Sequence, residues 1–460
     1  MLLKSEKKST LSIASIYAFR MLGLFIILPI FSLYADKIID ATPTLIGVAL
    51  GVYGLTQALL QIILGVFSDR YGRKPVILSG LIIFIIGSII AAMAHTIYGI
   101  IIGRALQGAG AIGSTLTALI SDTTKEENRM KAMSFIGMTI GLSFIGAMVL
   151  GPILNTWVGL SGIFWLTATL GAIGVVILIY GVPTPKKIIF HKSDKTMPIQ
   201  IKSVLREPEL LRLNYGVFTL HAMLTALFLA VPLILINYMS ISIDKQWIIY
   251  LPVLFISFLL MMPFIIIAET KNLMKPVFVG AIIILTTMQF LLYEFNHNII
   301  IMSLLLVLYF SSFTLLEAAL PSLISKIAPI SSKGTAMGIY SSAQFFGIFF
   351  GGVLGGVILH HFGIQGIFIF NGTLGIVWVV MATTMKKPKQ FSSKIYSISK
   401  KNLYLDAKAL QQKILKIPGV EEVIIFLDEN SAYLKIDKKL FNEAEVKEIL
   451  YNTLHISDHS

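Results

Sequence analysis

The 460-residue sequence predicts an all-α membrane protein with twelve transmembrane helices in two six-helix halves, followed by a small α+β domain of the ferredoxin-like type. Three observations support this prediction. Twelve apolar runs are each about 20 residues long, the length at which a helix spans a bilayer. A polar segment separates the sixth run from the seventh. After the twelfth run the composition changes to that of a soluble domain.

The composition itself indicates a membrane protein. Hydrophobic residues make up 56% of the chain and charged residues 13%, and the mean hydropathy is +0.83. Soluble domains usually carry about 25% charged residues, so this chain has too few to cover a water-facing surface of its size. The chain has 0 cysteines, which excludes disulfides, cysteine metal sites and thiol catalysis.

The loops between the apolar runs alternate in charge, and every second loop is rich in Lys and Arg. Such loops face the cytoplasm, so the net charge of +13 reflects topology rather than nucleic-acid binding. We therefore expect a multi-pass protein of the bacterial inner membrane with cytoplasmic N- and C-termini. The runs lie at about 11–35, 43–66, 76–94, 97–120, 132–153, 161–182, 213–236, 247–268, 276–294, 299–325, 336–359 and 366–385.

An internal repeat supports the division into halves. Leu119-Ile120-Ser121 matches Leu323-Ile324-Ser325, and at the same offset Gly151 falls on Gly355. Parallel repeats of two six-helix halves occur in a large class of transporters, with the substrate path between them. The predicted domains are an N-terminal half at 1–182, a cytoplasmic linker at 183–212, a C-terminal half at 213–389 and a cytoplasmic tail domain at 393–460.

The tail domain shows the order strand, helix, strand, strand, helix, which suits a ferredoxin-like fold. The order also resembles a heavy-metal-associated domain, but the absence of Cys removes the metal-binding pair, so no metal is expected. Helical spacing and strand alternation place a helix at 409–417, strands at 423–427 and 432–436, and a helix at 442–454.

A charged turn joins the second and third runs and reads Gly65-Val66-Phe67-Ser68-Asp69-Arg70-Tyr71-Gly72-Arg73-Lys74-Pro75. As a plain topology anchor it would need only its cations, which leaves Asp69 and the spacing unexplained. The stretch resembles the signature loop of the major facilitator superfamily: a glycine, three residues, Asp-Arg, one residue, then Gly-Arg-Lys. The match is complete, and it implies that superfamily's fold and a transport function.

The resemblance also implies a cytoplasmic latch. Arg73 would pair with Asp122 at the end of the fourth span, and Asp69 would lie near the start of the eleventh span, where the helix dipole favours an anion. These contacts would form in one state and break when the halves rock. The implied latch residues are Gly65, Asp69, Arg70, Gly72, Arg73, Lys74 and Asp122.

Two arginines lie within apolar runs. Arg104, in Arg104-Ala105-Leu106-Gln107-Gly108, resembles the superfamily's Arg-x-x-Gln-Gly motif. A cation there is usually partnered or faces a cavity, so we interpret it as an electrostatic neighbour of a protonating group, the alternative being a structural or snorkelling arginine. Arg20 resembles part of a first-span motif of drug–proton antiporters, although its position near the cytoplasmic end also suits snorkelling.

The fifth-span antiporter motif is only partly present. Gly151-Pro152 is in place, but Ala147 stands where a glycine is expected and Asn155-Thr156 replaces two glycines. This departure weakens the prediction of antiport. The small residues still predict close helix packing.

Glu317 lies well inside the tenth span and is the leading candidate for proton coupling. Ionisable residues inside a membrane are expensive and usually functional. The alternative is a permanently paired structural glutamate. His221 in the seventh span is a second candidate, although an interior histidine is often only hydrogen-bonded. Polar residues that could line a substrate cavity are Arg20, Tyr34, Gln57, Gln61, Gln107, Tyr215, Gln344 and Asn371.

The sequence contains no catalytic set and no Gly-rich phosphate loop with Lys-Ser/Thr, so we expect neither an enzyme nor an ATP-driven pump. We predict a monomeric transporter that needs no cofactor and uses the proton gradient to export a small amphipathic compound by alternating access. Its partners would be that substrate, protons and the lipid bilayer. Two alternatives stay open: a proton symporter importing a sugar or other metabolite, and a transporter-fold sensor whose tail domain is the output.

Overall fold

The structure is a computed structural model that describes residues 4–34, 37–124, 126–183, 197–271, 273–329, 332–386, 391–398, 407–426, 431–437 and 440–451. The chain forms two compact units. The first comprises Met1–Lys192, Asn214–Ala319 and Gly338–Thr384, and it holds most of the helical bundle. The second comprises Ser193–Leu213, Leu320–Met337 and Met385–Ser460. Of the predicted linker, 184–196 lies outside the described residues.

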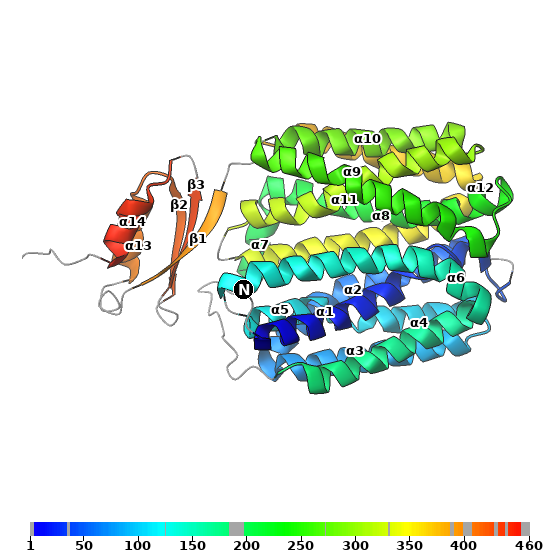
Figure 1. Ribbon diagram of the computed structural model, residues 1–460, viewed down its shortest axis with the longest axis horizontal. Helices are drawn as coiled ribbons and strands as arrows, with labels where there is room; N and C mark the ends of the chain where they lie inside the picture. Colours follow the sequence, from blue (N-terminus) through cyan, green and yellow to red (C-terminus); the bar gives the residue numbers. More distant parts are fainter. Residues whose placement is uncertain are drawn as a thin grey trace, which may run out of the picture. The chain divides into compact units, whose positions relative to one another are not determined.

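Long helices run side by side in the bundle (Figure 1). Threonines begin two of them: the side chain of Thr42 accepts a hydrogen bond from the Leu45 amide, and that of Thr96 accepts one from the Gly99 amide. The N-terminal half comprises α1 (Lys4–Phe25), η1 (Phe31–Tyr34), α2 (Pro43–Tyr71), α3 (Arg73–Met93), α4 (Ile97–Ala109), α5 (Gly113–Thr123) and α6 (Glu126–Gly181). After it come α7 (Met197–Leu205), α8 (Pro208–Asn237), η2 (Ile243–Lys245), α9 (Trp247–Thr270), α10 (Met274–Phe295), α11 (Ile299–Ile327) and α12 (Lys333–Thr383).

Twelve spans result from these helices. Eight described helices are long and apolar enough to cross a membrane. Two of the eight, α6 and α12, each contain two spans, divided at Gly159 with φ 64° and at Gly363 with φ 66°, a backbone conformation that favours glycine. The helix α1 and the pair α4–α5 supply the remaining two spans. This confirms the predicted membrane fold, and the two glycines stand at the same offset as Gly151 and Gly355.

Small residues set the distances between helices. A Cβ on Gly151 of α6 would lie 2.6 Å from the Ile26 carbonyl oxygen, and one on Gly351 of α12 would lie 2.2 Å from that of Ala222 in α8. Helix association in lipid depends on this close van der Waals packing. The contacts agree with the close packing that the sequence predicts for these glycines.

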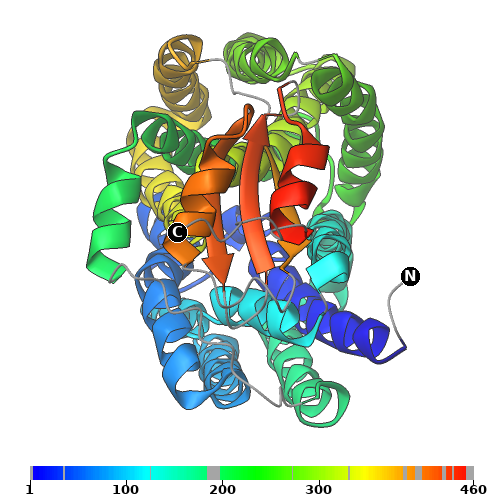
Figure 2. The ribbon, with the colours of Figure 1, turned by 90° about the vertical axis from the view of Figure 1, so that its left-hand side faces the viewer.

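The tail domain contains β1 (Phe391–Ser397), α13 (Ala407–Leu415), β2 (Val420–Phe426), β3 (Ser431–Asp437) and α14 (Glu443–Tyr451). The strands form an antiparallel sheet in the order β1-β3-β2, with Tyr396 opposite Ala432 and Val423 opposite Leu434. Figure 2 shows both helices on one face of this sheet. The order of elements confirms the predicted ferredoxin-like type.

The two faces of β3 differ in character. Ala432, Leu434 and Ile436 are buried in the domain's apolar core. Lys435 points the other way, because successive strand residues alternate. Within the second unit its Nζ donates to the carbonyl oxygens of Ile327 at 3.0 Å and Ala328 at 3.2 Å. These carbonyls end α11, where the helix leaves them without partners and the dipole favours a cation.

Candidate functional site

Three side chains from different helices meet inside the C-terminal half: His221 of α8, Glu317 of α11 and Gln344 of α12. Gln344 Nε2 lies 2.8 Å from His221 Nε2 and 3.4 Å from Glu317 Oε1. His221 Nε2 lies 3.6 Å from Glu317 Oε2, which is too long for a hydrogen bond. We call these residues the His–Glu–Gln cluster. It unites both titratable candidates for proton coupling with one of the predicted cavity residues.

The hydrogen bonds of His221 define its tautomer. Its Nδ1 lies 3.1 Å from the carbonyl oxygen of Val217, one turn earlier on α8. A carbonyl oxygen only accepts, so Nδ1 carries the proton. In the neutral ring Nε2 is then an acceptor, and it receives an N–H of the Gln344 amide. The other N–H of that amide is available to Glu317 Oε1. One amide group therefore donates to both titratable residues.

The Glu317 side chain is more exposed than that of His221, although its Oε2 atom is buried. The side chain of Glu317 is 37% exposed and that of His221 is 4% exposed. Within the described part of the chain, Glu317 Oε2 accepts no hydrogen bond. Tyr340, one turn before Gln344 on α12, is close enough to interact electrostatically with Glu317, and its buried hydroxyl also has no hydrogen-bond partner among the described residues. The carboxyl can therefore accept a proton or a further donor.

Four phenylalanines, the aromatic cluster, lie beside these polar groups. Phe144 of α6 contacts Phe228 with ring centroids 6.3 Å apart, and Phe310 and Phe313 at 6.4 Å each. Phe313 precedes Glu317 by one turn of α11 and meets the His221 ring edge-on at 5.9 Å. The aromatic cluster therefore joins the two halves next to the His–Glu–Gln cluster.

The helices α2 and α12 form a close contact between the halves. A Cβ on Gly47 would lie 2.2 Å from the Gly352 carbonyl oxygen, and one on Gly54 would lie 2.4 Å from that of Phe345. Farther along, Ser342 Oγ donates to the Ala58 carbonyl at 3.1 Å. At Gly338, one turn nearer the start of α12, a Cβ would meet nothing within 4 Å. The contact is therefore tight at the end away from the 65–75 turn and loosens toward it.

The predicted arginines belong to a separate network around Tyr53 of α2. Arg20 Nη2 donates to the Tyr53 hydroxyl at 3.2 Å and to Gln57 Oε1 at 3.1 Å. Arg104 lies over the Tyr53 ring at 4.8 Å and donates to Gln107 Oε1 at 2.9 Å. Gln57 in turn donates to Gln61 at 3.0 Å. Both arginines are 1% exposed. The hydrogen bonds of Arg20 tie α1 to α2, and Arg104 Nε donates to the Ala49 carbonyl of α2 at 3.4 Å.

The charged turn adopts a defined geometry. Gly72, with φ 94°, separates α2 from α3, and Gly65 lets Ser114 of α5 approach. Arg73 Nε donates to Asp122 Oδ2 at 2.9 Å, and Arg73 also forms an ion pair with Asp69. Asp69 stays 52% exposed. Arg70 lies over the Tyr71 ring, and Lys74 is half-buried.

The other predicted cavity residues lie apart from the His–Glu–Gln cluster. Asn371 is fully buried and donates to the Met223 carbonyl and to Gln289, each at 3.1 Å. Tyr215 packs against Phe218 with ring centroids 6.3 Å apart. Tyr34 donates to Asn155 Oδ1 at 2.5 Å.

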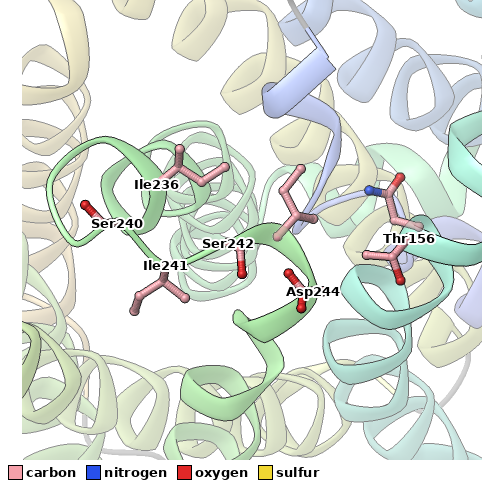
Figure 3. Close-up of a pocket in the computed structure, with 8 residues that line it drawn as sticks. Thr156, Ile236, Ser240, Ile241, Ser242 and Asp244 are labelled. Carbon is pink, nitrogen blue, oxygen red and sulfur yellow. The ribbon is translucent and has the colours of Figure 1, made fainter.

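Asn155 also borders a cavity of about 550 Å³ at the end of the bundle away from the 65–75 turn. Figure 3 shows Ser242 and Asp244 of the segment after α8 and Thr156 of α6 around this opening. Asn155 and Thr156 are the pair that departs from the antiporter motif, and neither was predicted as a site residue. The cavity is lined by Asn155, Thr156, Ile236, Ser240, Ile241, Ser242, Ile243 and Asp244.

Comparison with known proteins identifies the family. The Major Facilitator Superfamily profile matches residues 13–316 and 274–410, and the YajR YAM domain profile matches 402–452. The chain belongs to the major facilitator superfamily. It is 42% identical over 445 residues to the inner membrane transport protein YajR of Escherichia coli, which covers 97% of each chain. It is therefore a multi-pass membrane transporter of this superfamily.

More distant relatives agree on the fold. The class B tetracycline resistance protein of Escherichia coli is 30% identical over 169 residues, covering 33% of this chain and 42% of that protein. The crystal structure of a D-xylose-proton symporter superposes with a TM-score of 0.67 at 15% identity, covering 83% of this chain and 98% of the other. That structural similarity shows the major facilitator fold alone.

The major facilitator repeat relates the His–Glu–Gln cluster to the other half. At the offset that pairs Gly151 with Gly355, His221 corresponds to Tyr17 and Glu317 to Gly113. The Tyr17 hydroxyl donates to the Gly113 carbonyl at 2.9 Å. The same two positions therefore touch in both halves, but only the C-terminal pair is titratable on both sides. The repeat could have predicted that His221 and Glu317 meet. It carries no information about Gln344, whose equivalent is Ile140.

Proposed function

We propose that this protein is a proton-coupled transporter that exports small amphipathic compounds across a bacterial inner membrane by alternating access. Its termini and the 65–75 turn would lie in the cytoplasm, because the turn and its neighbouring loops hold the Lys and Arg residues. The inner-membrane location is supported by the likeness to the Escherichia coli protein. All the groups invoked come from one chain, so a monomer suffices.

The observation that carries the proposal is the His–Glu–Gln cluster. A partly exposed carboxyl, one oxygen of which has no described hydrogen-bond partner, stands beside a histidine inside an apolar bundle. Ionisable groups at such positions commonly form proton relays in transporters. Glu317 would take up the proton, and His221 would share it. Arg104 would act at a distance, since its hydrogen bonds are to residues of its own half.

The aromatic cluster supports the substrate class. Phe228, Phe310 and Phe313 are buried against one another in this structure, so they would offer an apolar surface, beside the carboxyl and amide, when the two halves separate. Binding sites for small molecules combine a mostly apolar lining with a few polar groups that fix orientation. The partial match to tetracycline resistance proteins agrees with a compound of this kind.

The charged turn would serve as the cytoplasmic latch. Arg73 joins the start of α3 to Asp122 at the end of α5. Because Arg73 also pairs with Asp69, it would keep Asp69 in position to contact the start of α12. When the halves close at the cytoplasmic side, Asp69 would meet the N-terminal dipole of α12. The contact between Asp69 and α12 stays a prediction.

Transport by purified protein in proteoliposomes tests the proposal. The probes are ethidium and tetracycline, and an internal pH dye reports proton movement. We expect either probe to drive proton counterflow, and Glu317→Gln to abolish it. Glu294→Gln, an exposed glutamate at the end of α10, is the matched control and should keep full activity. Full proton flux in Glu317→Gln would remove Glu317 from the mechanism, and co-transport in the same direction would contradict export by antiport.

A further inference from the structure

We propose that Gln344 is a positioning residue that transmits the protonation state of His221 and Glu317 to the α2–α12 contact. The inference rests on the proposed proton coupling and deepens it. Gln344 would link the binding of a proton in the C-terminal half to the packing of the two halves against each other.

The position of Gln344 on α12 is the first argument. Its amide contacts α8 and α11 through His221 and Glu317. Its close neighbours on α12 contact the other half: Ser342 donates to the Ala58 carbonyl, and the backbone of Phe345 meets Gly54. A single turn of α12 therefore joins the titratable groups on one side to α2 on the other. A displacement of this turn acts on both.

The second argument is the chemistry of the amide. Neutral His221 accepts at Nε2, so a Gln344 N–H can donate to it. When Nε2 gains a proton it becomes a donor, and two donors then face each other across 2.8 Å. Protonation of Glu317 likewise removes the negative charge toward which the second N–H is directed. Either proton weakens a bond of the same amide group, so Gln344 must rotate or move.

Gln344 is the residue placed to respond to the charges on His221 and Glu317. Among the described residues, His221 of α8 and Tyr340 of α12 are titratable groups that lie beside Glu317. Both lie on helices that also carry or contact Gln344. A buried donor that loses its acceptor is costly, and the bonds to charged acceptors are the stronger ones. We therefore expect the protonation-dependent change in the conformational equilibrium to fall about tenfold or more without this amide.

Distance measurements by spin labelling test the inference, since the native chain has 0 cysteines to interfere. Labels at Lys131→Cys and Lys271→Cys, both exposed, report on the end of the bundle that carries the charged turn. The distance distribution is recorded at several pH values in lipid nanodiscs. With all other residues native we expect a pH-dependent shift. Gln344→Met, which keeps the side-chain length and removes the hydrogen bonds, should lose most of that shift.

A matched control separates this role from folding. Gln289→Met removes a buried glutamine that bonds to Asn371 elsewhere in the C-terminal half, and it should keep the full pH response. An unchanged pH response in Gln344→Met overturns the inference and leaves the proposed function standing. Absence of any pH response in the otherwise native pair overturns both.

A second variant covers the case in which Gln344→Met does not fold. Ser342→Ala removes the hydrogen bond to the Ala58 carbonyl at the far end of the same link. We expect it to reduce the amplitude of the pH response while Glu317 still supports proton uptake. The full native amplitude in Ser342→Ala would show that this turn of α12 transmits nothing to α2, and would overturn the inference.

Discussion

Replacing Gly47 by alanine should open the α2–α12 contact at the end of the bundle away from the charged turn. The new Cβ would lie 2.2 Å from the Gly352 carbonyl oxygen and 2.7 Å from the Gly356 Cα. Both neighbours are backbone atoms, so no side chain can rotate away. Ordinary contact begins at 3.4 Å, and the helices must therefore separate by about 1.2 Å (3.4 minus 2.2).

The size of the effect follows from this clash. Overpacking a well-packed contact costs about 1–3 kcal/mol. If the contact exists in one state and is released in the other, the same energy shifts their equilibrium by about 5- to 150-fold. Gly47→Ala should therefore populate the state that is open at this end. The fold itself should survive, because the clash can be relieved by the same motion that the proposed alternating access requires.

Spin labels at Tyr98→Cys and Ile300→Cys, which are 54% and 69% exposed, measure the opening. The distance between them should lengthen in Gly47→Ala. The matched control is Gly141→Ala on α6, where an added Cβ meets nothing within 4 Å. Identical distance distributions in native protein and Gly47→Ala would refute the reasoning, as would an equal change in the control.

Two further outcomes are expected. Asp122→Asn keeps the size of the side chain but removes the charge that Arg73 contacts, so turnover in proteoliposomes should fall about tenfold while probe binding is unchanged; native turnover would count against the latch. In the tail domain, hydrogen bonds from Lys394 and Lys447 lower the pKa of Glu443 from its ordinary value of 4.5. A lowered carboxyl pKa stabilises the fold above the ordinary value and loses that contribution as the pH falls through the lowered one. Glu443→Gln should therefore speed hydrogen exchange of α14 in the full chain at pH 7, with a smaller difference at acid pH; equal exchange at both would contradict this.

The membrane fold was predictable because lipid leaves the backbone few choices. Helices satisfy every backbone hydrogen bond internally, so run length and loop charge suffice to count the spans. The exact ends of the helices were harder to predict from the sequence. α4 ends at Ala109, and the next residue, Gly110, lies so close to α3 that an added Cβ would be 2.3 Å from the Gly80 carbonyl oxygen, a contact that depends on how α3 packs. The turns at Gly159 and Gly363, where the backbone leaves the helical conformation, fall between the predicted runs 132–153 and 161–182 and between 336–359 and 366–385.

The sequence allowed individual residues of the candidate site to be predicted, but not the contacts between them. Glu317 and His221 stand out because a titratable group in an apolar run is costly wherever it points. Glutamine is less costly, so the sequence marks Gln344 only as a residue that could line a cavity, and its link to Glu317 and His221 depends on the rotation of α12. For Arg104 the resemblance implied a protonating neighbour, whereas its hydrogen bonds and ring contact involve Gln107 and Tyr53. An action of Arg104 on Glu317 through its electrostatic field, without direct contact, stays a prediction.

The two halves differ in what their polar groups do, and this difference indicates which helix moves. On the N-terminal side α2 is held by bonds that do not depend on a titrating partner: Arg20 to Tyr53 and Gln57, and Ser114 to the Gln61 carbonyl at 2.9 Å. On the C-terminal side α12 is held at Gln344 by hydrogen bonds to two titratable groups, His221 and Glu317. Under the proposed proton coupling, a change of protonation should loosen α12 from α8 and α11 but leave α2 fixed to α1 and α5. The α2–α12 contact should then change because α12 moves while α2 stays in place.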